Sequence, residues 1–276
     1  MRAYRLAYDG TPYRGFQRQP HGETVEDALL DALGSLGVLG GDDEGDEESA
    51  GDTPRGYAAA GRTDAGVSAL AQTVAFEAPD WLTPRALNGE LPADVRAWAS
   101  TDVPGGFHAT HDARSRTYSY HLHAPGADER LARAVCDRLS GEHDFHNLTS
   151  DDDGTIRHLR ASATREGSFL VCHFRAGGFP RGFVRRAVRL VGAVATGDRP
   201  IGFVDRVLAP DPLDGPGGVA AAPPEPLVLL SVTYPGTRFD VDERAAASAR
   251  EVFGGRRAAA SARSRAMGLL ADGVDG

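Results

Sequence analysis

The seven residues from Gly61 to Val67 read GRTDAGV. Small residues surround a base and an acid, Arg62 and Asp64, whose side chains would point the same way in an extended chain. Gly61 and Gly66 permit sharp turns and let a ligand approach the backbone closely. A carboxylate in such a place needs a nearby cation to stay ionised. By itself, the segment fits either a site built on Asp64 or a structural turn with a surface ion pair.

Periodic apolar residues on both sides of this segment predict alternating strands and helices. Thr24 precedes an amphipathic stripe, and Asp27, three residues later, resembles the second half of a capping box. A similar stripe runs from Phe183 to Ala195. The predicted helices are 24–36, one that opens at 83, 131–139, 183–195 and 240–271, the last with a break at Gly254-Gly255. The predicted strands are 4–8, 73–77, 95–100, 117–123, 168–175 and 227–234.

The order strand, helix, strand, strand, helix, strand occurs roughly twice. It predicts an α+β fold, in which two similar α/β halves with antiparallel sheets join into one mixed sheet flanked by helices. The expected N-terminal half is 1–103, with an acidic insertion at 40–54 that has too few apolar residues to pack. The C-terminal half is expected at 104–238, and an Ala/Arg-rich helical tail at 239–276.

The net charge of −9 argues at first against an RNA partner, but the acids are concentrated. Residues 42–52 hold seven acids and residues 151–153 three more, and without these ten the net charge of −9 becomes +1. All 30 basic residues are arginines, whose forked guanidinium groups suit phosphates. Many acids without lysine fit a salt-adapted organism, although a strong GC bias in the coding sequence would also remove lysine.

Several classes of protein are disfavoured by the sequence. No stretch approaches about 18 uninterrupted apolar residues, so no transmembrane helix is expected. The first residues, MRAYRLAYDG, lack the apolar core of a secretory signal, and we expect a cytoplasmic protein. Cys136 and Cys172 lie in apolar segments and are expected to be buried free thiols. Histidines such as His108 and His111 form no pattern with Cys or acidic residues that predicts a metal site.

Other segments carry a resemblance in the same order along the chain. They are YDGTPYRGFQRQ (8–19), LNGELPADVRAW (87–98), FHATHDARSRTYSY (107–120), GEHDFHNL (141–148), FVRRAVRLVG (183–192) and EPLVLLSVTYP (225–235). Together with GRTDAGV, they resemble the tRNA pseudouridine synthase I family (TruA) over about residues 4–235. The GRTDAGV match is long and specific, and such collinearity is hard to obtain by chance. The resemblance therefore implies a pseudouridine-synthase-like sheet.

The resemblance also implies a role for each matching residue. Asp64 takes the position of the family's catalytic aspartate, and Tyr118 that of the tyrosine that packs on the target base. Arg62 takes the place of the motif arginine, and Arg189 that of the arginine paired with the catalytic carboxylate. Leu227 takes the place of the apolar residue beside the uracil. The loop with Phe16, Gln17 and Arg18 is expected near the RNA.

Arginines outside the motif are expected to help with RNA docking. One group, Arg181, Arg185, Arg186 and Arg189, clusters at the predicted helix 183–195 opposite its apolar stripe, and a second group, Arg114, Arg116, Arg157, Arg160 and Arg165, lies nearby in the sequence. As a set they could neutralise the phosphates of a stem-loop, and binding would then weaken with salt.

The implied activity is the isomerisation of uridine to pseudouridine at positions 38–40 in the tRNA anticodon arm, by a homodimer. The reaction breaks the C1′–N1 bond and joins C5 to C1′, so no cofactor or metal is expected. Positive charge that develops at C1′ suits a carboxylate such as Asp64. Glycal, acylal and Michael-type mechanisms all remain open.

The chain departs from the family pattern at Ser68, where His is usual, and at Pro226, where Gly is usual. The proline fixes φ and removes a donor. Three other functions stay open: a non-catalytic RNA-binding protein on the same scaffold, a synthase for another RNA position, and a carboxylate glycosidase. The glycosidase would need a second acid, and the motif segments offer none that pairs with Asp64.

Overall fold

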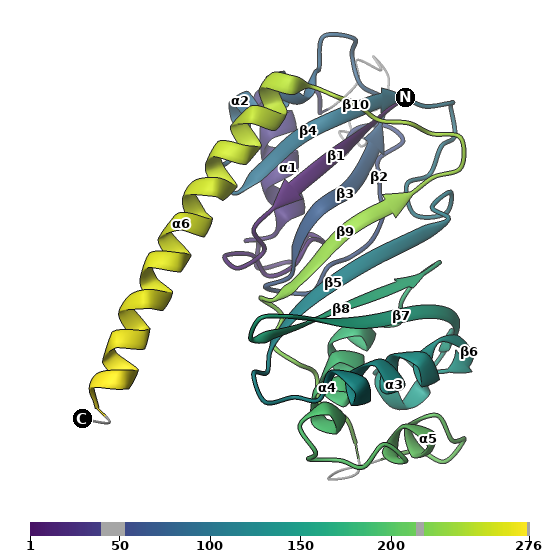
Figure 1. The fold of residues 1–276 in the computed structure, drawn as a ribbon. Helices are drawn as coiled ribbons and strands as arrows, with labels where there is room; N and C mark the ends of the chain where they lie inside the picture. The colour runs from purple at the N-terminus through teal and green to yellow at the C-terminus, as the bar shows by residue number, and fades with distance from the viewer. Residues whose placement is uncertain (40–52, 214–217, 275–276) are drawn as a thin grey trace.

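The computed structural model describes residues 1–39, 53–213 and 218–274, which form one ten-stranded sheet with helices packed on it (Figure 1). The N-terminal elements are β1 (Arg2–Tyr8), α1 (Val25–Ser35), β2 (Ala58–Ala59), β3 (Ser68–Phe76), α2 (Pro84–Glu90) and β4 (Val95–Asp102). The next elements are β5 (Ser115–His123), α3 (Glu129–Leu139), β6 (Gly141–Asp144), a short 3-10 helix η1 (His146–Leu148), β7 (Ile156–Glu166) and β8 (Phe169–Ala176). The chain continues with α4 (Phe183–Ala195), α5 (Phe203–Val207), β9 (Leu227–Thr233), β10 (Asp240–Val241) and α6 (Glu243–Gly273). Most of the predicted acidic insertion, residues 40–52, lies outside the described residues.

The sheet is mixed because of one strand from late in the chain. Its order is β10-β4-β1-β3-β9-β5-β8-β7-β6, with β2 paired to β3. Strand β9 lies between the N-terminal strand β3 and the C-terminal strand β5, parallel to β3 and antiparallel to β5. The other pairings are antiparallel. This arrangement confirms the expected α+β class with one mixed sheet flanked by helices. The domain limits at 103 and 238 stay predictions.

Local sequence explains where the main helices begin. The Thr24 hydroxyl accepts the N–H of Asp27, and the Asp27 carboxylate accepts the N–H of Thr24, so the predicted capping box is confirmed. Helix α4 spans the predicted Phe183–Ala195, and its buried residues follow the apolar stripe. Strand β7 was not predicted, because its alternating polar residues include few large apolar side chains.

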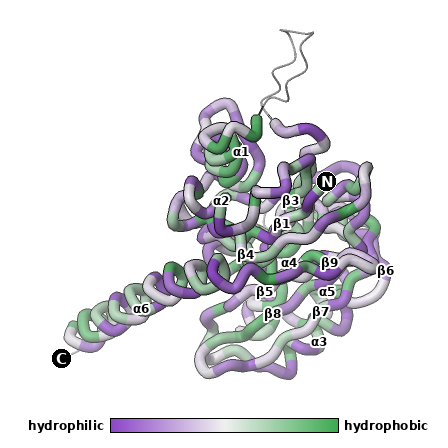
Figure 2. The backbone as a smooth tube through the Cα atoms, turned by 90° about the horizontal axis from the view of Figure 1, so that it is seen from above, coloured by the Kyte–Doolittle hydropathy of each residue, from purple (hydrophilic) through white to green (hydrophobic). Residues whose placement is uncertain are grey.

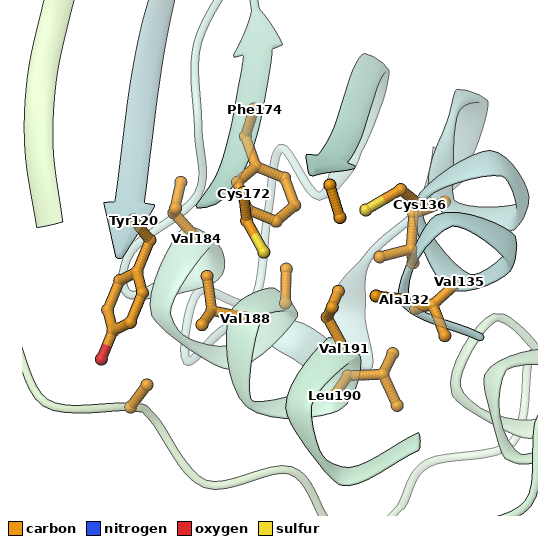
Figure 3. Packing of buried hydrophobic residues seen from close by; sticks show 14 of the residues in the cluster. Tyr120, Ala132, Val135, Cys136, Cys172, Phe174, Val184, Val188, Leu190 and Val191 are labelled. Carbon is orange, nitrogen blue, oxygen red and sulfur yellow. The ribbon is translucent and has the colours of Figure 1, made fainter. Parts of the chain in front are cut away.

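Two hydrophobic clusters hold the helices on the sheet. One joins α3 and α4 to β5, β7 and β8, and the other joins α1 and α2 to β1, β3 and β4. In Figure 3, Val188 and Val191 of α4 and Cys136 of α3 lie around Cys172 and Phe174 of β8. Both cysteines are free and buried, as expected. None of the described helices is long and apolar enough to cross a membrane.

Helix α6 projects from the body of the protein in both views (Figures 1 and 2). Its start is fixed by Asp242, whose carboxylate accepts the N–H groups of Arg244 and Ala245. The predicted break at Gly254-Gly255 is wrong, because the helix continues to Gly273. Each glycine costs about 1 kcal/mol in a helix, but the alanines and arginines around the pair are strong helix formers.

Candidate active site

A cleft of about 910 Å³ brings together the Asp64 segment, β5, the start of β9 and the first turn of α4. Tyr118 lines this cleft and packs against both hydrophobic clusters, so the cleft lies where the clusters meet. Its volume falls within the range of about 300–1,000 Å³ that is usual for small-ligand sites. The two halves of the sheet therefore both contribute walls to one site.

The loop that carries Asp64 is fixed from the N-terminal side of the protein. The N–H of Phe16 donates to the carbonyl oxygen of Thr63 at 3.0 Å. The hydroxyl groups of Tyr8 and Thr63 are hydrogen-bonded at 2.7 Å, and both residues are buried. Asp64 itself keeps a side chain that is 37 % exposed and lines the cleft. The carboxylate is thus presented by a rigid loop without being sealed from a ligand.

Glycine is required at two points around this loop. Gly66 has a φ of +80°, and a Cβ there would lie 2.8 Å from Cγ of Pro224. Gly15 has a φ of +104°, and its Cβ would lie 2.9 Å from the carbonyl oxygen of Thr63. Side chains other than hydrogen would be strained at both positions. The second glycine of GRTDAGV therefore serves close packing against the loop before β9.

The cation that faces Asp64 belongs to Arg185 on α4. Nη1 of Arg185 lies 3.4 Å from Oδ2 of Asp64, and Nε donates to the carbonyl oxygen of Ala222 at 2.7 Å. Arg189, which the resemblance pairs with the carboxylate, lies one turn further along α4, is exposed and does not line the cleft. The expected Arg189 contact is therefore corrected to Arg185. The physical reason is that α4 directs its first turn, not its second, at the Asp64 loop.

Tyr118 and Leu227 both line the cleft. The ring of Tyr118 meets the edge of Phe179 at a centroid distance of 5.3 Å and an angle of 84°. Burial raises the pKa of Tyr118 to about 12, and the negative charge of Asp64 adds to the shift. Tyr118 is therefore a neutral phenol at neutral pH. Phe179 was not anticipated from the sequence, because it follows a Gly-Gly pair with no periodic pattern.

The side chain of Arg116 is buried and hydrogen-bonded to the protein backbone, so it is not a phosphate contact. Its guanidinium donates to the carbonyl oxygens of Ala60, Thr110 and Gly177. Only 8 % of the residue is exposed, and burial lowers its pKa from the ordinary arginine value. This corrects its expected role in RNA docking. Three segments of the cleft wall are tied together by this one side chain.

The other predicted residues lie at different depths. Arg62 is exposed at the cleft, Phe16 is fully buried in its wall, and Gln17 is exposed beside it. Arg18 forms an ion pair with Asp27 at 2.9 Å. The residues that line the cleft without having been predicted as site residues include His108, His111, Asp151 and Thr110.

Two further predicted positions lie away from the cleft lining. Arg186 is half-buried on α4 and is not among the residues that line the cleft. Ser68, where the family usually has His, lies outside it and accepts the N–H of Gly10 at 3.0 Å. No group of three His, Cys, Asp or Glu residues that could hold a metal occurs in the described parts of the chain.

Comparisons with known proteins agree with one another. A family model described as tRNA pseudouridine synthase matches residues 135–235. Proteins named tRNA pseudouridine synthase A are similar over nearly the whole chain. The protein from Natronomonas pharaonis is 62 % identical over 272 residues, 98 % of each chain. That from Haloarcula marismortui is 55 % identical, with 99 % of this chain and 100 % of the relative covered. That from Methanothrix thermoacetophila is 36 % identical over 87 % of this chain and 85 % of the relative.

Proposed function

The chain belongs to the tRNA pseudouridine synthase family and isomerises uridine to pseudouridine in tRNA, and from this premise we propose that it acts on the anticodon arm, at positions 38–40, with Asp64 as the nucleophile. The observation that supports the role of Asp64 is its ion pair with Arg185 in the cleft that Tyr118 also lines, whereas the anticodon arm is proposed from the family resemblance alone. In the competing glycosidase mechanism, a second acid near the carboxylate would be needed. The ion pair that the structure gives Asp64 is instead with an arginine.

The target nucleotide must leave the RNA stack to reach Asp64. We assign the uracil to the apolar wall of Tyr118 and Leu227, and C1′ of the ribose to the side of Asp64. Arg185 holds the carboxylate in place beside the sugar through this ion pair. When the C1′–N1 bond breaks, positive character at C1′ is stabilised or trapped by Asp64. The ring then turns, C5 bonds to C1′, and the proton on C5 is lost while N1 gains one.

Tyr118 holds the base during this turn and excludes water. Its pKa of about 12 makes it a poor general base at neutral pH. The aromatic ring, backed by the edge of Phe179, can still pack on the detached uracil and keep it from escaping. Water at C1′ would give hydrolysis and free uracil instead of pseudouridine. Tyr118→Phe is therefore expected to retain far more activity than Tyr118→Ala.

Exposed arginines at the cleft are proposed to contact the RNA backbone. Arg62, two residues before Asp64 in the sequence, and Arg181 both line the cleft and are exposed. Arg181 is held by Asp151, which accepts its backbone N–H at 2.7 Å. Contacts of this kind release counterions, so the affinity for tRNA should fall as salt rises. By family resemblance we also propose a homodimer, which sedimentation equilibrium would test.

Pseudouridine mapping tests the site and the residue together. A tRNA transcript is treated with wild type or Asp64→Asn at low and high KCl, and carbodiimide-induced primer-extension stops locate pseudouridine. Stops in the anticodon arm with wild type alone are expected. A matched control is Asp102→Asn, which changes an exposed carboxylate on β4 outside the cleft. Stops at other positions would refute the anticodon-arm assignment, and an active Asp64→Asn would refute the nucleophile.

A further inference from the structure

Two histidines without an assigned role pack against each other, with their rings tilted, in the wall of the cleft. His108 and His111 lie in the connection between β4 and β5, and both are exposed. Their ring centroids are 4.1 Å apart, with an angle of 42° between the planes. Both residues line the same cleft as Asp64 and Tyr118. They therefore present aromatic surface to whatever enters this site.

The turn that carries the two rings is fixed to the cleft wall. The carboxylate of Asp112 accepts the N–H of His108 at 2.8 Å. The Thr110 hydroxyl donates to the carbonyl oxygen of Ala59, and Arg116 donates to the carbonyl oxygen of Thr110 at 2.8 Å. These contacts join the turn to strand β2 and to the buried side chain of Arg116 on β5. The backbone of the turn is thus held in place before any ligand arrives, which lowers the entropy lost on binding.

Hydrogen bonding also sets the tautomer of His108. Its Nδ1 accepts the N–H of Thr110 at 3.2 Å and lies 3.4 Å from that of His111, which also donates to it. An acceptor nitrogen carries no proton, so the proton of the neutral ring is on Nε2. In the described part of the chain, the ring of His111 packs on His108 and makes no hydrogen bond.

We propose that His108 and His111 form a stacking subsite for the nucleobase next to the target uridine. The inference rests on the proposed function, because it takes the RNA to be bound with its uridine at Asp64. A nucleotide beside an extruded base loses a stacking neighbour, and single-stranded bases in RNA loops stack on aromatic and histidine side chains. The rings are close enough to act as one platform, and Nε2–H of His108 can donate to the edge of the base.

His111 gives the sharper test, since removing the His108 ring would also disturb the turn. The probe is a stem-loop RNA of anticodon-arm sequence, bound to Asp64→Asn protein so that no turnover occurs, and Kd is measured by fluorescence anisotropy. One stacked base is worth enough for Kd to rise by about fivefold or more in His111→Ala. His111→Phe, which keeps an aromatic plane, should recover most of the loss, whereas His111→Gln should not. The matched control is His121→Ala, an exposed histidine on β5 that does not line the cleft.

The salt dependence separates stacking from a phosphate contact. Removal of a ring that only stacks should raise Kd by the same factor at every salt concentration, whereas loss of a phosphate contact would lower the slope of log Kd against log salt by about one. That lower slope, or a Kd for His111→Ala equal to that of the parent, would overturn the subsite.

Pseudouridine formation by wild type on the same RNA distinguishes the two proposals. Turnover together with equal Kd values would overturn the subsite alone. A complete absence of turnover would overturn the anticodon-arm assignment and the subsite with it. Turnover by wild type, with a weaker Kd for His111→Ala that His111→Phe restores, would support both.

Discussion

Replacing Arg185 by Gln is expected to slow the chemical step, and replacing Arg189 in the same way is not. Arg185 makes two contacts, with the Asp64 carboxylate at 3.4 Å and with the carbonyl oxygen of Ala222 at 2.7 Å. Arg189 lies one turn later on the same helix and is exposed. The two substitutions remove the same charge from neighbouring turns, so their difference reports the contacts that Arg185 makes with Asp64 and Ala222.

The size of the effect follows from the exposure of the pair. Deleting one partner of a hydrogen bond to a charged group costs about 1.5–3 kcal/mol. The side chain of Asp64 is 37 % exposed and that of Arg185 is 22 % exposed, so solvent screens part of this interaction. We therefore expect a loss of about 1–2 kcal/mol, which corresponds to a rate about 5- to 30-fold lower.

Single-turnover kinetics with enzyme in excess over tRNA isolate this step from binding and product release. The rate at saturating enzyme should fall for Arg185→Gln and stay within about twofold of wild type for Arg189→Gln. Arg185→Lys, which keeps the charge but not the forked geometry, should lie between wild type and Arg185→Gln. Equal rates for wild type and Arg185→Gln, or a larger loss for Arg189→Gln, would refute the assignment of the partner of Asp64.

Three further predictions concern stability and the projecting helix. Leu29→Ala removes a fully buried side chain of α1 and should lower the free energy of unfolding in urea by about 2–5 kcal/mol. The control is Leu70→Ala at a half-exposed position, and an equally small loss of stability for both variants would contradict the packing. Burial raises the pKa of both Tyr118 and Tyr234 to about 12, so the folded state holds these protons more tightly than the unfolded state does. The free energy of unfolding should therefore fall by about 1 kcal/mol per tyrosine between pH 9 and 11, and constant urea midpoints over this window would refute the shifts. Deleting residues 258–276 should leave the melting temperature and the single-turnover rate as in wild type, because nearly all described residues of this segment are exposed; a loss of rate without a loss of stability would indicate that the helix contacts RNA.

Several elements could be predicted from the sequence because their causes are local. The capping box of Thr24 and Asp27 and the apolar stripe of α4 depend on residues within a few turns of each other. Strand β7 was not predicted, because its alternation is carried mainly by polar residues. The break expected at Gly254-Gly255 failed because the neighbouring helix formers outweigh two glycines.

Within the site, the GRTDAGV segment was recognisable in sequence, but its partners were not. The choice between Arg185 and Arg189 depends on which turn of α4 meets the Asp64 loop, a difference of one helical turn. The buried position of the Arg116 guanidinium depends on carbonyl oxygens contributed by three separate segments. Neither arrangement leaves a periodic signal along the chain.

The sequence by itself determined the α+β class, the main helices and the Asp64 segment, since periodicity, caps and a long motif are properties of neighbouring residues. Only the tertiary structure decided which residues, distant in the sequence, meet in the site. The parallel pairing of β3 with β9 joins Ser68 to Val228, and this long-range contact brings Leu227 to the cleft that Asp64 and Tyr118 line. Contacts between residues so far apart are selected by packing of the whole sheet, so local pattern cannot specify them.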